Sequence, residues 1–356
     1  MTTDPRTGGL LAQQAAAALA EGDNVAAAGL AGEAADAFLR EQGEPSFDAP
    51  NMLRLRAQAL LALGGQAGAC VTLDRAQALA APLPPGEPFD RLRVQLGRLR
   101  GEALLAAGDR PGAQAALEAA LERCEATLGD DDLDAGALHN MLGIVGKFTG
   151  AFDEAAAHYA RAGAIFRDTA VQERELGALH HNLGGLAHSR GDLPTAERET
   201  RRALELRAAT HGPAHPDTAA DRGQLGAILS ELGRHEEAEH ELRRAATDMI
   251  AAHGGDHHEV GIARTALGAA LHRAGRLDEA AVAYADGLAV RERRQGAGHP
   301  ELAPTLVNLS RLSEQRGDPA QALALAHRAV ANLDGAVAAD HPILRAAQAR
   351  LAELDT

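Results

Sequence analysis

The sequence predicts an all-α fold, a right-handed α-solenoid, and two observations carry that prediction. First, apolar residues make up 46% of the chain and are mostly Ala and Leu, whereas aromatic residues account for 2% and Trp is absent. Ala and Leu favour helices, and no stretch alternates apolar and polar residues as a strand would. Second, one pattern recurs about every 42 residues along the chain. Self-similarity of that period is the signature of stacked helix-turn-helix repeats.

Eight repeats share this pattern, which starts with a small residue that we call the first position. A glycine follows seven residues later, and another small residue follows five residues after the glycine. The first positions are Ala15, Ala57, Gly101, Gly143, Gly184, Gly226, Gly268 and Ser310. About three divergent repeats occupy residues 1–128, and regular repeats occupy 129–356 as part of one continuous solenoid. Residues 341–354 are predicted to form one further helix that caps the end of the stack.

Each recurrent residue has a mechanical reason. A small first position lets the two helices of a repeat approach closely, and the glycine suits the left-handed conformation that ends the first helix. Asp-Leu-Pro after Gly191 suits the cap and first turn of the second helix. Large residues such as Tyr159, Leu242 and Tyr284 are expected to fill the space beside the small first positions.

The pattern resembles the tetratricopeptide repeat, in the long form of kinesin light chain and its bacterial relatives. The usual repeat has about 34 residues. The extra length lies in longer helices and in links with a patterned histidine, which is His215, His257, His299 and His341 in the last four links. Asp132 and Glu173 stand at the same place in earlier links. The resemblance covers residues 130–355 well and the first 100 loosely. The link histidines are predicted to be structural and to cap a helix end.

Composition excludes several classes of function. The formal net charge of −15 argues against a nucleic-acid partner, which needs basic patches. Lys147 is the only lysine, so the lysine-based carboxylate clamp of chaperone-binding relatives cannot be assembled. No apolar run is long enough to span a membrane. Cys70 and Cys124 form no motif and are expected to be buried in a reducing compartment. The chain is therefore predicted to be cytoplasmic, and its Lys-poor, Ala- and Arg-rich composition suggests a bacterial source.

The resemblance implies that a protein or peptide segment binds along the concave groove, which is lined by the first helix of each repeat. Asn and Gln side chains can both donate to and accept from a peptide backbone, whatever its sequence. In the resembling family the Asn of an Asn-Leu motif does this, and Asn182 and Asn308 match that motif, whereas Asn140 is displaced by one residue. Cationic side chains would add a preference for acidic or C-terminal groups. The predicted peptide-binding residues are Asn140, Lys147, His181, Asn182, His188, Gln224, His272, Arg273, Asn308 and Arg311.

Other chemistries find little support. The 16 histidines include no paired ligands with a carboxylate at the spacing of a zinc-enzyme helix, so no metal and no cofactor are predicted. Asp130, Asp131, Asp132 and Asp134 lack the alternation of a calcium loop and instead suit an acidic first turn. No phosphate-binding loop or nucleophile motif is present, so no catalytic residue is assigned.

Three functions remain open. The leading one is a binding scaffold or adaptor. The second is a regulator that responds to a peptide or small ligand, and the third is an enzyme with its site in the concavity. The sequence is also compatible with self-association through the N-terminal repeats.

Overall fold

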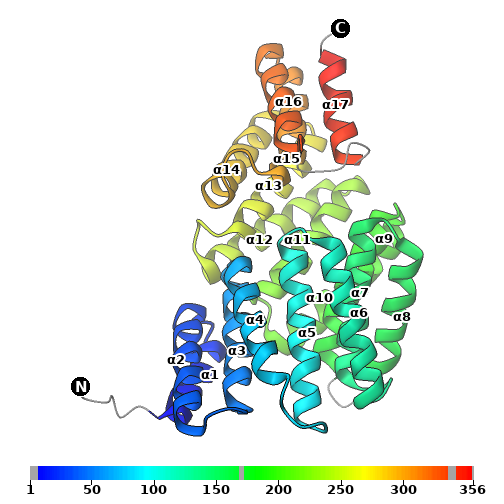
Figure 1. Ribbon diagram of the computed structural model, residues 1–356. Helices are drawn as coiled ribbons and strands as arrows, with labels where there is room; N and C mark the ends of the chain where they lie inside the picture. The colour runs from blue at the N-terminus through cyan, green and yellow to red at the C-terminus, as the bar shows by residue number, and fades with distance from the viewer. Residues whose placement is uncertain (1–6, 168–171, 336–341, 355–356) are drawn as a thin grey trace, which may run out of the picture. The chain divides into compact units, whose positions relative to one another are not determined.

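The computed structural model describes residues 7–167, 172–335 and 342–354. Its described residues form helices and no strand. The helices, labelled in Figure 1, are α1 (Gly8–Ala20), α2 (Asn24–Gln42), α3 (Asp48–Ala62), α4 (Gln66–Ala80), α5 (Phe89–Ala106), α6 (Arg110–Thr127), α7 (Leu133–Thr149), α8 (Phe152–Arg167), α9 (Gln172–Ser189), α10 (Leu193–His211), α11 (Pro216–Glu231), α12 (His235–His253), α13 (His258–Arg273), α14 (Leu277–Gln295), the 3-10 turn η1 (Pro300–Leu302), α15 (Ala303–Gln315), α16 (Pro319–Leu333) and α17 (Pro342–Leu354).

The helices follow the eight predicted repeats, from the pair α1–α2 to the pair α15–α16. The prediction of an all-α solenoid of helix-turn-helix repeats is therefore confirmed. Packing divides the chain into an N-terminal half, Met1–Leu179, and a C-terminal half, His180–Thr356, and in each half consecutive helices pack against one another. The boundary predicted at 128/129 separates divergent from regular repeats, which is a different property from packing, and it stays a prediction.

The first positions bring the two helices of a repeat into close contact, as predicted. A Cβ atom added to Gly143 would lie 2.4 Å from the ring of Tyr159, and one added to Gly268 would lie 2.8 Å from the ring of Tyr284. Both tyrosines are 1% exposed. Burial raises the pKa of Tyr284 to about 12. These contacts fix the spacing of the two helices, since interiors are close-packed and leave no room for an added methyl group.

The helix ends also match their prediction. The glycine that follows the first helix of each repeat has a positive φ, for example +85° at Gly150, where a side chain would be strained. Four second helices, α2, α6, α10 and α16, begin with a capping aspartate: for example, Asp192 accepts a hydrogen bond from the amide of Thr195, and Asp318 accepts one from the amide of Gln321. Such caps satisfy amides that have no partner within the helix.

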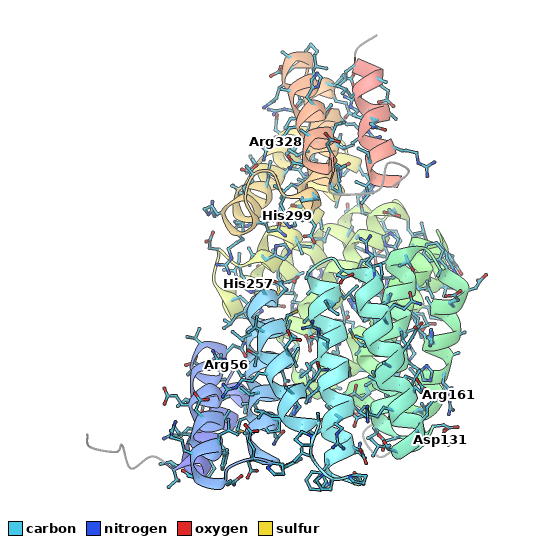
Figure 2. The ribbon with its side chains drawn as sticks, in the orientation of Figure 1. Arg56, Asp131, Arg161, His257, His299 and Arg328 are labelled. Atoms are coloured by element: carbon cyan, nitrogen blue, oxygen red, sulfur yellow. The ribbon has the colours of Figure 1, made fainter. Side chains whose placement is uncertain are left out.

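The link histidines cap helices, which confirms the structural role predicted for them. Nδ1 of His215 accepts the amide hydrogen of the residue two positions later at 3.2 Å, and His257 and His299 do the same at 3.3 Å. Figure 2 labels the last two. His341 lies outside the described residues. In an earlier link Asp132 caps α7 in the same way, so Asp and His exchange at this position.

The acidic cluster before α7 is a capping and ion-pairing site, in line with its predicted structural role. Asp132 and Asp134 both bind the guanidinium of Arg91, at 2.9 Å and 2.8 Å. Burial acts to raise the pKa of Asp132, but the hydrogen bond from Arg91 holds that pKa below its usual value. Asp131 pairs with Arg161 at 2.9 Å. Figure 2 labels both residues.

The C-terminal helix α17 packs on α15 and α16, as expected of a cap. Arg350 anchors it, because its guanidinium is buried and donates to the hydroxyl of Ser310 at 3.0 Å and pairs with Glu314 at 2.8 Å.

The two cysteines differ from each other. Cys124 is buried, as predicted, and burial raises the pKa of its thiol to about 12. The prediction was wrong for Cys70, which is only partly buried. It lies beside the buried Ala69 on α4, on a side of the helix that the core only partly covers. Both thiols are free.

No described helix combines the length and the apolar character that crossing a membrane requires.

Candidate functional site

The last turns of the first helices in the C-terminal half carry a row of polar contacts that crosses from repeat to repeat. We call His188, Glu231, His272, Arg273 and Gln315 the polar ladder. His188 Nε2 lies 3.0 Å from Glu231, Arg273 lies 3.3 Å from the same carboxylate, and His272 Nε2 lies 3.1 Å from Gln315. Three predicted site residues, His188, His272 and Arg273, are thus brought together along α9, α11, α13 and α15.

The ladder follows a simple offset. A side chain four residues after one first position meets the side chain five residues after the next, so most partners are 43 residues apart in sequence. Gln315 was not among the predicted residues. This offset between neighbouring helices was the signal that could have identified it.

Two of the predicted amide side chains, Gln224 and Asn308, lie in the seam between consecutive repeats. Gln224 donates to the main-chain oxygen of His181 at 3.3 Å, across from α11 to α9. Asn308 forms a side-chain hydrogen bond with Tyr284 of the preceding repeat. Asn182 is 9% exposed, so it is less accessible than the sequence led us to expect. Arg350 reaches the preceding repeat from the same position of α17. Side chains two residues before the first position therefore join repeats.

A buried ionic cluster lies beside this seam. Asp221 has no exposed surface, and its Oδ1 lies 2.7 Å from His181 Nδ1 and 3.0 Å from the guanidinium of Arg207. His181 was among the predicted residues, and its two partners were not. The available signal was Asp221 itself, because the neighbouring repeats carry Leu179, Ala263 and Thr305 at this place.

Arg311 and Lys147 have no seam or ladder contact with any described residue. Arg311 on α15 is exposed and forms no hydrogen bond or ion pair with any described residue. In the N-terminal half, Lys147 lies with its Nζ 4.9 Å from the ring centroid of Phe148, and burial lowers its pKa. Asn140 also lies on α7, is partly buried and takes part in an interaction.

One group of possible metal ligands occurs among the described residues. Ligand atoms of His211, His215 and Asp217 all lie within 4.8 Å of one another, with His211 Nδ1 3.4 Å from the carboxylate of Asp217. His215 Nδ1 already accepts the amide hydrogen of Asp217. The structural role of capping α11 explains this histidine without a metal.

Comparison with known proteins supports the repeat assignment. The chain matches the tetratricopeptide repeat family model over residues 91–168, 175–249 and 222–293, which together exceed half of its length. No curated protein sequence matches.

Solved structures of bacterial proteins are similar in fold. A Rap protein complexed with competence and sporulation factor is 15% identical, with a TM-score of 0.64 over 98% of this chain and 97% of that one. The apo form of the quorum sensor NprR from B. thuringiensis is 12% identical, with a TM-score of 0.63 over 92% and 87%. BtubC (BKLC) from P. vanneervenii is 21% identical, with a TM-score of 0.52 over 68% and 92%. At these identities the likeness concerns the fold alone.

Proposed function

This chain belongs to the tetratricopeptide repeat family, and from that premise we propose that it is a scaffold that binds an extended protein or peptide segment. The proposed binding surface is the face formed by the first helices α9, α11, α13 and α15. The observation that supports it is the polar ladder, which places hydrogen-bonding side chains on successive repeats at equivalent positions.

The spacing of the ladder suits an extended peptide. Packed helices lie about 8–10 Å apart, and an extended chain rises about 3.3 Å per residue. A peptide that runs across the first helices would therefore advance about three residues per repeat, and four first helices would accommodate about twelve residues. Ladder side chains are only partly satisfied by their mutual contacts, because each offers several donors or acceptors.

Arg311 is the proposed recognition point for a carboxylate on the peptide. It is exposed and has no partner among the described residues, so a bound carboxylate would supply the acceptor that its guanidinium lacks. Arg273 shares Glu231 with His188 and is the proposed second contact. Asn308 and Gln224 are proposed to form hydrogen bonds with the peptide main chain from the seam between repeats. Gln224 already donates such a bond to a main-chain oxygen of the neighbouring repeat.

A peptide-responsive regulator is the second candidate function. The similar Rap structure holds competence and sporulation factor, and NprR is described as a quorum sensor. In this alternative the bound peptide changes how the chain engages a further partner. The proposal places the protein in the bacterial cytoplasm, assigns it no catalytic step, and includes self-association through the N-terminal repeats, where Leu10 and Val25 are exposed.

The test is selection from a display library of about twelve-residue random peptides, matched to the predicted span. Affinities of a selected peptide are then measured by fluorescence anisotropy for the wild type and for the double variant Arg273→Ala/Arg311→Ala. We expect the double variant to bind about 10- to 100-fold more weakly, as loss of charged hydrogen bonds implies. Arg345→Ala, an exposed arginine on α17, is the matched control and should bind as the wild type does.

Unchanged affinity of the double variant would place the peptide elsewhere on the molecule. Failure to select any peptide would instead favour a small ligand over a peptide.

A further inference from the structure

A hollow of about 580 Å³ lies between the second helices α12 and α14, with α13 as its floor. None of its lining residues belongs to the polar ladder. Six apolar side chains line it, which are Ala246, Ile250, Leu267, Leu271, Val282 and Ala283. Ile250 and Val282 are 37% and 62% exposed, so both contribute accessible apolar surface to the hollow. The hollow falls within the usual size range of small-molecule sites.

The preceding repeat shows why this hollow is open. The equivalent place, 42 residues earlier, has only about 310 Å³. There Leu204 packs against the same cluster as Leu225 and Leu229, and Glu241 lines the space. Ala246 and Ala283 replace Leu204 and Glu241 in the next repeat. Leu204 and Glu241 therefore partly fill the space in the preceding repeat, whereas the equivalent alanines leave it open in this one.

Ala283, together with Val290 in place of Asp248, leaves one cation without a partner. In the preceding repeat, Arg222 pairs with Glu241 at 3.1 Å and lies 3.8 Å from Asp248. The equivalent residues are Arg264, Ala283 and Val290. Arg264 lines the hollow, is partly buried, and forms no hydrogen bond or ion pair with any described residue.

The other charges around the hollow are committed or lie in solvent. Glu279 pairs with Arg276 and lies 3.7 Å from Arg243, and Asp278 pairs with Arg316 at 3.0 Å. Asp286 is exposed, where water screens its charge. Arg264 is thus the partly buried charge of the site that has no counter-ion, and an anion would complement it.

We propose that this hollow binds an amphipathic monocarboxylate, with its aliphatic tail on the leucine and valine side chains and its carboxylate on Arg264. The site is separate from the proposed peptide surface, and this proposal does not depend on the peptide proposal. An aliphatic tail matches the apolar walls, and a carboxylate is the anion that a guanidinium binds through two parallel hydrogen bonds. Each added methylene should tighten binding about fourfold while the tail stays inside the hollow.

Isothermal titration calorimetry of the full chain tests the proposal, with octanoate and decanoate below their micelle concentrations and decanol below its solubility limit. We expect decanoate to bind at one site per chain, more tightly than octanoate and at least about tenfold more tightly than decanol. Arg264→Gln should bring decanoate down to the affinity of decanol. Arg345→Gln, distant in sequence and exposed, should leave decanoate binding unchanged.

The preceding repeat supplies variants that the fold already tolerates. Ala246→Leu should abolish decanoate binding by filling the hollow, and Ala283→Glu/Val290→Asp should abolish it by giving Arg264 the partners that Arg222 has. Thermal melting checks that each variant folds. No binding of decanoate to the wild type, equal affinity for decanol, or wild-type binding by folded Arg264→Gln would each overturn the proposal. Selected peptides binding normally to Arg264→Gln would show that the two sites are distinct.

Discussion

Two consecutive repeats, α11–α12 and α13–α14, show how one frame carries different surfaces. In both, the first position packs directly on a large buried residue, Leu242 in one and Tyr284 in the other. Both begin with a histidine cap. In both, an arginine before the second helix pairs with glutamates of its own and the preceding repeat, Arg234 in one and Arg276 in the other. They differ beside their second helices. In the first repeat Arg222 pairs with Glu241 and lies near Asp248, whereas in the second the equivalent Arg264 lines the hollow. The positions that the two repeats share thus determine the fold, and the positions that differ between them are available for binding.

The largest expected effect would come from breaking the shared frame. Gly226→Val and Gly268→Val should each destabilise the chain by more than about 3 kcal/mol, because even a Cβ would lie 2.5 Å from Leu242 and 2.8 Å from Tyr284. Urea denaturation followed by circular dichroism measures the loss. Gly298→Ala is the control, since nothing lies within 4 Å of its added Cβ. Similar losses at the two glycines would support a common frame, and tolerance at either would refute it.

A smaller effect on the free energy of unfolding should distinguish Arg222 from Arg264, which occupy equivalent positions in the two repeats. Arg222→Met should destabilise the chain by about 2 kcal/mol, because it removes the cation that the largely buried Glu241 binds at 3.1 Å and leaves Asp248 with only Arg244, at 3.7 Å. Arg264→Met should change the free energy of unfolding by less than about 0.5 kcal/mol, because Arg264 has no partner among the described residues. Equal losses from these matched substitutions would mean that Arg264 is paired after all.

The smallest effect concerns the histidine caps that both repeats share. His257→Ala should destabilise the chain by about 1 kcal/mol at pH 7.5 through loss of the cap. Burial, with the nearby His253, Arg294 and His258, lowers the pKa of His257 below its unfolded value of about 6.5. Its contribution is therefore present above about pH 6.5 and is lost as the pH falls toward the folded pKa, because the unfolded chain takes up the proton first.

His257→Asp is the matched variant for that prediction, since Asp132 caps α7 at the equivalent place. Melting curves from pH 7.5 to 5 should show less acid destabilisation for this variant than for the wild type. A parallel decline of the two proteins would exclude His257 as the source.

Periodicity in the sequence was enough to predict the frame. A close approach requires a small residue, and a left-handed helix end requires glycine, so Gly143 and Gly150 could be interpreted without coordinates. The histidine caps were predictable because they recur at one offset. Such features depend on local chemistry and on contacts within one repeat.

The surfaces were harder to predict, because they depend on contacts between repeats. Asp221 meets His181 and Arg207 across 40 and 14 residues of sequence, and no single repeat contains all three. The hollow beside Arg264 exists because alanines stand where the preceding repeat has larger side chains. This difference becomes visible only when equivalent positions are compared. The exposure of Asn182 was overestimated, since its side chain is only 9% exposed.

Hydrogen exchange with and without a selected peptide tests the central claim, that the first helices bind and the second helices support them. We expect slower amide exchange on peptide binding in α11, α13 and α15, strongest near Arg273 and Arg311, with α12 and α14 unchanged. Protection confined to α12 and α14, with no change in the first helices, would contradict it.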